Sequence, residues 1–79
     1  MKQSMRKIKQ SVVKKTITKF IDSEWHDNFK RGWPFVRAFN VFMATDKTSV
    51  HVLCLRNYIP FDDAQWDELW IEYKRQVPK

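Results

Sequence analysis

Three side chains of this 79-residue chain could ligate a metal ion: His26, His51 and Cys54. A structural zinc site needs four ligands, usually supplied as two close pairs. His51 and Cys54 are three residues apart, and in the strand predicted there this spacing places them on opposite faces. We therefore interpret His51 as a histidine near the surface and Cys54 as a buried apolar residue, and we expect no metal or cofactor.

A group of carboxylates near the C-terminus could carry acid–base chemistry. On a helix, Asp63, Asp67 and Glu68 lie away from the apolar positions, which is typical of a solvated face and not of a buried pair with separated pKa values. No Ser–His–Asp or Cys–His arrangement is supported, because each needs a pocket that so small a core can hardly hold. The sequence therefore predicts a protein that is not an enzyme. The full group is Asp62, Asp63, Asp67, Glu68 and Glu72.

The strongest functional signal is the charge of the N-terminal half. Residues 1–37 contain ten Lys or Arg and three Asp or Glu, for +7, whereas residues 38–79 contain five and six, for −1. Such a surface can bind phosphates without any sequence motif, and its excess of Lys over Arg favours diffuse attraction over bidentate base recognition. Cations kept only for solubility are the plainer alternative. The candidate partner or phosphate contacts are Arg6, Lys7, Lys9, Lys14, Lys15, Lys19, Lys30, Arg31, Trp33 and Arg37.

Trp33 joins this set because it lies in a predicted turn. The chain has four Trp, six Phe and two Tyr, more than one small core obviously requires. An exposed Trp beside cations can mark a protein contact or a platform for base stacking. Ile71 is also expected to face solvent, as single exposed apolar residues commonly do.

Length and composition set the remaining bounds. A chain of 79 residues that is 43% hydrophobic forms one small folded domain. Its single glycine argues against a turn-rich all-β fold. The lone Cys54 cannot form an internal disulfide, so we expect a reducing, cytoplasmic setting. No apolar run approaches the roughly 18 residues of a membrane span, and the basic start lacks the apolar segment of a signal peptide.

The segment 61–79 predicts a C-terminal helix. Asp62 is a good N-cap, and Gln65 completes a capping box. Phe61 and Trp66 fit a hydrophobic staple. An apolar stripe at helical spacing follows, and we expect it to be buried against Phe20, Ile21 and a sheet. The stripe consists of Trp66, Leu69, Trp70, Tyr73 and Val77.

For residues 11–31 the spacing of apolar side chains predicts one helix that ends before Gly32. The alternative is a strand over residues 12–21, which the many β-branched residues of this segment favour. A short helix capped by Asp22 or Ser23 would then follow.

Residues 35–44 and 50–55 are predicted to form a β-hairpin joined by a turn at 45–48. Both faces of these strands are apolar, so they need cover on both sides. We expect the helices, a third strand from residues 12–21, or a homodimer to supply it. The alternative for the first run is a helix opened by Pro34.

The predicted fold is therefore α+β: an N-terminal helix, a hairpin and a C-terminal helix packed on the sheet. Residues 1–10 form a basic, frayed segment, and residues 11–79 form the domain. The profile is similar to that of the short accessory proteins with which phages redirect host machinery, a resemblance of composition alone. It implies a regulator or inhibitor of a protein partner within host nucleic-acid machinery, such as RNA polymerase or a nuclease. The alternative is direct, largely sequence-independent nucleic-acid binding, and contact with a membrane ranks last.

Overall fold

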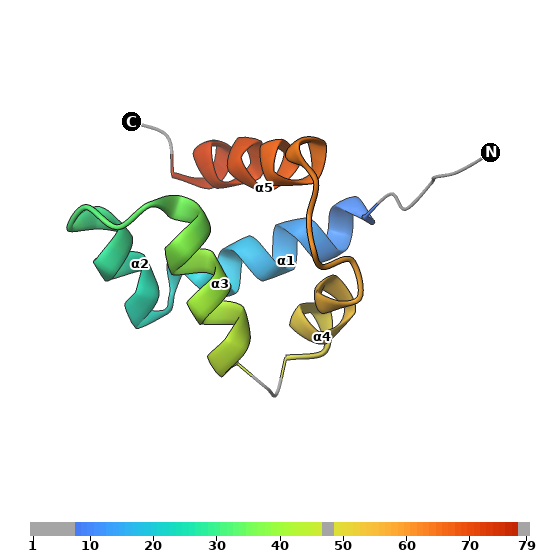
Figure 1. Ribbon diagram of the computed structural model, residues 1–79, viewed down its shortest axis with the longest axis horizontal. Coiled ribbons are helices and arrows are strands. Elements are labelled where there is room, and N and C mark those ends of the chain that lie inside the picture. The colour runs from blue at the N-terminus through green and yellow to red at the C-terminus, as the bar shows by residue number, and fades with distance from the viewer. Residues whose placement is uncertain (1–7, 47–48, 78–79) are drawn as a thin grey trace.

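The computed structural model describes residues 8–46 and 49–77, and within these ranges the chain forms five helices and no strand (Figure 1). The predicted α+β class is therefore wrong, and the fold is all helical. The helices are α1 (Gln10–Ile21), α2 (Glu24–Lys30), α3 (Phe35–Thr45), α4 (Val50–Arg56) and α5 (Asp63–Gln76).

Helix α1 is the centre of the arrangement, because it packs against α2, α4 and α5. Helix α2 packs in turn against α3. In Figure 1, α5 lies above α1, while α4 and the pair α2–α3 lie toward opposite ends of α1. The core between them is drawn from four helices. Its fully buried apolar side chains are Val13, Ile17, Phe20, Ala38, Phe39, Val52, Leu55 and Leu69.

Helix α5 begins as the sequence predicts. The Asp62 side chain accepts a hydrogen bond from the Gln65 backbone N–H at 2.8 Å, and the Gln65 side chain accepts one from the Asp62 N–H at 2.9 Å. This reciprocal capping box satisfies two backbone donors that the helix itself cannot. The rings of Phe61 and Trp66 lie 5.0 Å apart, so the hydrophobic staple is also confirmed.

The apolar stripe of α5 is buried only in part. Tyr73 is buried, and its ring lies 6.3 Å from that of Phe20, as predicted. Trp70 was expected in the core but is 37% exposed. Its indole lies at the edge of the aromatic cluster, 5.1 Å from the ring of Phe35, and no strand of the described residues covers it. Ile71 is 56% exposed and faces solvent, as predicted.

The single helix predicted over residues 11–31 is in fact two. Residues 12–21 are helical, so the third strand considered there is wrong. The Ser23 hydroxyl donates to the carbonyl of Phe20 at 2.6 Å. Serine hydroxyls compete in this way with the helical hydrogen-bond ladder, and the chain turns here before α2 starts. Ser23 is the N-cap of α2, as the alternative prediction supposed.

Helix α2 ends at the glycine that the sequence indicated. Gly32 has a φ of 122°, which side chains with a Cβ rarely adopt. The N–H groups of Gly32 and Trp33 donate to the carbonyls of Phe29 and Asn28, each at 3.1 Å. This is a Schellman motif. It fixes Trp33 in the turn that leads to α3.

The segment predicted as the first strand of a hairpin is helix α3. Its buried residues follow the spacing of one helical face, so the helix needs cover on one side only. A strand of the same sequence would need cover on both. Pro34 precedes the helix as its N-cap, one position earlier than the alternative prediction supposed. The buried residues are Ala38, Phe39, Phe42 and Met43.

The segment predicted as the second strand is helix α4. Val52 and Leu55 are buried, and their spacing of three fits one side of a helix. Burial of this side outweighs the β-propensity of the run, because that propensity depends on context. The opposite faces inferred for His51 and Cys54 are also wrong, because on a helix the two lie on the same side, and Cys54 is exposed where burial was expected. His51 is partly exposed.

Candidate binding surface

The ten predicted contact residues do not form one surface. Arg6 and Lys7 lie outside the residues that the structure describes. Lys9 is the N-cap of α1 and is exposed. The remaining seven fall into two groups, one on α1 and one around the turn between α2 and α3. These groups are Lys14, Lys15 and Lys19 on α1, and Lys30, Arg31, Trp33 and Arg37 around the turn.

The outer face of α1 carries three exposed lysines, Lys14, Lys15 and Lys19. Ser11 and Thr18 lie among them and are also exposed. Within the described residues, no carboxylate forms an ion pair with any of the three ammonium groups. An anionic ligand could therefore bind these lysines without first breaking an internal salt bridge.

A shallow groove runs between α1 and α4. It has a volume of about 500 Å³ and is lined by Ser11, Lys14, Lys15, Thr18 and His51. The Nε2 atom of His51 is buried and has no hydrogen-bond partner among the described residues. Buried polar atoms are nearly always paired, so this one calls for an explanation.

A second hollow continues from this groove over α4. It has a volume of about 220 Å³ and is lined by Ser11, Val12, Lys15, Val50, His51 and Cys54. Val50 is 72% exposed and Leu53, three residues further along the same helix, is 43% exposed. This exposed apolar face of α4 was not predicted from the sequence. A helical interpretation of residues 50–56 would have found it, because Val50, Leu53 and Cys54 share a side that Val52 and Leu55 do not.

In the second group of predicted residues, Lys30, Trp33 and Arg37 have partners within the chain, whereas Arg31 is exposed. Lys30 forms an ion pair with Asp27 at 3.6 Å. Trp33 was expected to be exposed, but it is partly buried: its ring stacks on Trp25, with centroids 6.4 Å apart. The Arg37 guanidinium lies 4.7 Å from the centroid of the Trp33 ring. Such a cation–π contact stabilises the turn, so these groups are less free for a partner than the lysines of α1.

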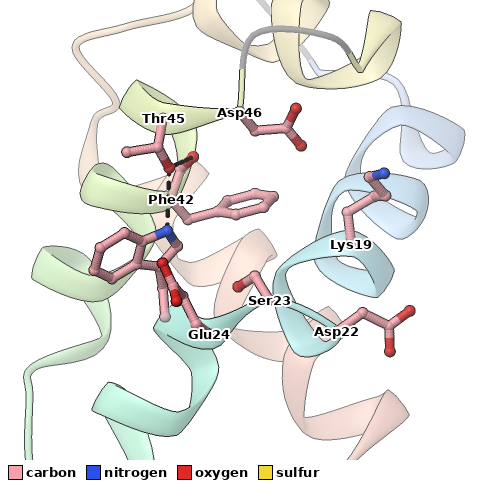
Figure 2. Close-up of a pocket in the computed structure, with 8 residues that line it drawn as sticks. Lys19, Asp22, Ser23, Glu24, Phe42, Thr45 and Asp46 are labelled. Atoms are coloured by element: carbon pink, nitrogen blue, oxygen red, sulfur yellow. Dashed lines mark hydrogen bonds between the residues drawn. The ribbon is translucent and has the colours of Figure 1, made fainter.

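A further hollow, of about 330 Å³, lies beside α1, α2 and the end of α3 (Figure 2). The two hydroxyl groups of this hollow already form hydrogen bonds within the chain. The Ser23 hydroxyl donates to the Phe20 carbonyl. The Thr45 hydroxyl lies 3.1 Å from the Val41 carbonyl and accepts a hydrogen bond from Trp25 Nε1 at 3.1 Å. No histidine is among the described residues that line it, so no imidazole is placed to activate these hydroxyls. The lining residues are Lys19, Asp22, Ser23, Glu24, Trp25, Phe42, Thr45 and Asp46.

His26, considered above as a metal ligand, is a core residue. Its Nε2 shares a hydrogen bond of 2.8 Å with the Tyr73 hydroxyl, and both residues are buried. Burial lowers the pKa of His26 below its usual 6.5, and the charge of Lys30 acts in the same direction. The charge of Asp27 and a backbone hydrogen bond at Ile21 oppose this shift. Burial also raises the pKa of Tyr73.

The acidic group predicted near the C-terminus is not entirely solvated. Glu72 is 2% exposed and pairs with Arg75 at 2.8 Å. The Gln76 side-chain amide donates to the same carboxylate at 2.9 Å and to the backbone carbonyl of Lys14 at 3.1 Å. These bonds join the end of α5 to α1 and leave Glu72 without a free site for chemistry.

Comparison with known proteins gave no match to a protein-family model, to a curated protein or to a solved structure. In the part of the chain that the structure describes, no three His, Cys, Asp or Glu side chains gather so as to hold a metal ion. No helix of residues 8–46 and 49–77 has both the length and the apolar character needed to cross a membrane.

Proposed function

We propose that the chain is a small non-enzymatic binding protein that regulates or inhibits a protein partner, and that it contacts this partner through α1 and α4. One observation carries the proposal: Lys15 of α1, which no carboxylate of the described residues pairs, borders the exposed apolar Val50 of α4. Val50 lines the same hollow as Lys15, and Leu53 follows it on the same helix. Apolar side chains surrounded by polar and charged ones are typical of protein interfaces.

Direct nucleic-acid binding is the competing function, because the three exposed lysines of α1 could also neutralise phosphates. Two features favour the protein partner. Val50 and Leu53 are exposed apolar side chains that have no counterpart on a phosphate backbone. Trp33, predicted as either a protein contact or a stacking platform, is already in contact with Trp25 and Arg37, which removes one candidate for base stacking. Cations at the edge of an apolar patch would instead attract an acidic protein surface and speed association.

The experiment is a fluorescence-anisotropy titration of a labelled random duplex and a labelled single-stranded RNA between 50 and 200 mM salt. If three lysines neutralised phosphates on the duplex, the log–log salt slope would be about −2.7, and affinity would fall about 40-fold over this range. We expect dissociation constants weaker than about 100 μM at 150 mM salt, the weak limit of ordinary non-specific binding.

A pair of charge-matched variants shows which lysines matter. Lys14→Glu with Lys15→Glu changes the net charge from +6 by −4 to +2, and Lys30→Glu with Lys74→Glu does the same. One result would overturn the protein-partner proposal and make α1 a phosphate-binding helix. The parent chain would bind either nucleic acid more tightly than about 100 μM at 150 mM salt, and this binding would be lost in the first variant and kept in the second.

A further inference from the structure

We infer that the groove between α1 and α4 binds an acidic amphipathic helix of the protein partner. This inference rests on the proposed function and adds the chemistry of the partner. The groove has cationic side chains along α1 and an apolar continuation over α4. An amphipathic helix with carboxylates beside its apolar face would match both features, as in other complexes where a helix lies in a groove.

The dimensions suit two turns of helix. From Ser11 to Thr18 the backbone of α1 rises about 10 Å, at about 1.5 Å per residue. The stems of Lys14 and Lys15 can cover apolar surface while their ammonium groups stay at the rim. Apolar residues of the partner at i, i+3 or i+4, and i+7 would then face α4, where Val50 and Cys54 line the hollow. Carboxylates on the flank would face the two ammonium groups.

His51 supports a polar contact in the groove. Its Nε2 is buried and lacks a hydrogen-bond partner within the described residues, although the residue lines both hollows. An unsatisfied buried nitrogen costs about 1–3 kcal/mol. Carboxylate and hydroxyl groups are the kind of partner that this nitrogen lacks, and a purely apolar ligand has none.

Charge excludes two other occupants. The chain's own residues 1–7 contain Lys2, Arg6 and Lys7 and no carboxylate, so they have the same sign as the groove. The outer face of α5 in a second copy has the right sign at Asp63 and Asp67, both exposed. Two chains of net charge +6 repel each other, however.

The test is an NMR titration of the ¹⁵N-labelled full chain with two synthetic 18-residue peptides of identical Leu, Glu and Ala composition. One peptide places Leu at i, i+3, i+4 and i+7, and the other distributes Leu around the helix. We expect the amphipathic peptide to bind at least about 10-fold more tightly, because only it can bury its Leu side chains together on the α4 face. Amide shifts should change in α1 and α4.

Two substitutions of exposed apolar residues provide the matched control. Val50→Ser, at a residue that lines the hollow over α4, should weaken binding of the amphipathic peptide about 10-fold, the effect of roughly one lost apolar contact. Ile71→Ser on α5 should have no effect, because Ile71 is comparably exposed but lies outside the groove. Both variants should keep the helical circular dichroism of the parent chain.

Three results would overturn the inference: equal binding of the two peptides, shift changes confined to α5, or no binding at millimolar peptide. Line broadening that grows with protein concentration in the absence of peptide, and that disappears in an Asp63→Lys variant, would instead identify a second copy as the occupant. A different result would contradict the proposed function itself, namely nucleic-acid binding at physiological salt that depends on the lysines of α1.

Discussion

Replacing Tyr73 by Phe removes one hydroxyl from the core and leaves His26 without its hydrogen-bond partner. The two atoms lie 2.8 Å apart, and the residues are 7% and 6% exposed, so water cannot easily take the place of the hydroxyl. An unsatisfied buried polar group costs about 1–3 kcal/mol. A domain of this size has a total stability of about 4–12 kcal/mol. The variant should therefore lose a measurable part of its stability while retaining its fold.

The assay is urea unfolding followed by circular dichroism, on the parent chain, on Tyr73→Phe, on His26→Phe and on the double variant. Each single variant leaves one buried polar group unpaired, whereas the double variant leaves neither. The double variant should therefore lose less stability than the sum of the two single losses, and the difference measures the coupling. In thermal unfolding, each kcal/mol lost should lower the midpoint by about 4–8 °C.

The pH dependence follows from the lowered pKa of His26. The folded state disfavours the charged imidazole, so below pH 6.5 the unfolded state binds more protons than the folded state does. Stability is therefore complete above the unfolded pKa of 6.5 and falls as the pH drops below it. The slope from this group is at most about 1.4 kcal/mol per pH unit.

The His26→Phe variant should show a flatter stability profile between about pH 7.5 and 5.5. A Tyr73→Phe variant within about 0.5 kcal/mol of the parent, the level expected of an ordinary surface substitution, would refute the reasoning. So would a His26→Phe variant with an unchanged pH profile.

Three further substitutions test the fold. Asp62→Ala should lose about 1 kcal/mol in urea unfolding, because it removes the cap of α5; Asp63→Ala, one residue later and without the cap bond, should lose less, and equal losses would contradict the capping role. Phe20→Ala should lower the free energy of unfolding by about 3–5 kcal/mol. Trp70→Ala should lower it less, because Phe20 is 0% exposed and Trp70 is 37% exposed. A larger loss for Trp70→Ala in thermal unfolding would contradict this assignment of the core. Gly32→Ala should cost about 1–3 kcal/mol through backbone strain alone, because no atom lies within 4 Å of the added Cβ; an unchanged midpoint would show that the turn can relax.

The sequence was sufficient where a structure depends on neighbours along the chain. The cap of α5 is built from Asp62 and Gln65, and the end of α2 from hydrogen bonds that Gly32 and its neighbour Trp33 donate to the last turn of the helix. Such local hydrogen bonds form wherever the helix starts or stops, so residue type and spacing identify them. The basic charge of residues 1–37 was equally visible, and it does supply the three lysines of α1.

The surface around those lysines could not be found in the same way. Val50 and Leu53 were assigned to a strand, so their exposed face beside α1 was not recognised. The turn residues were expected to be free, but Trp33 contacts Trp25 on α2 and Arg37 on α3. These contacts join residues whose relative positions depend on how the helices pack.

Only the tertiary structure decided between strand and helix for residues 35–56. The side chains of this segment are rich in Phe, Val and Leu, which suit either a two-sided strand or a one-sided helix, and short apolar runs do not distinguish the two. The helical choice buries Phe39 and Phe42 against Phe20 of α1, with centroids 5.4 and 5.6 Å apart. It also lets α4 bury Val52 and Leu55 while α1 covers it. A hairpin would have needed cover on both faces, and the remaining helices of so short a chain supply it on one.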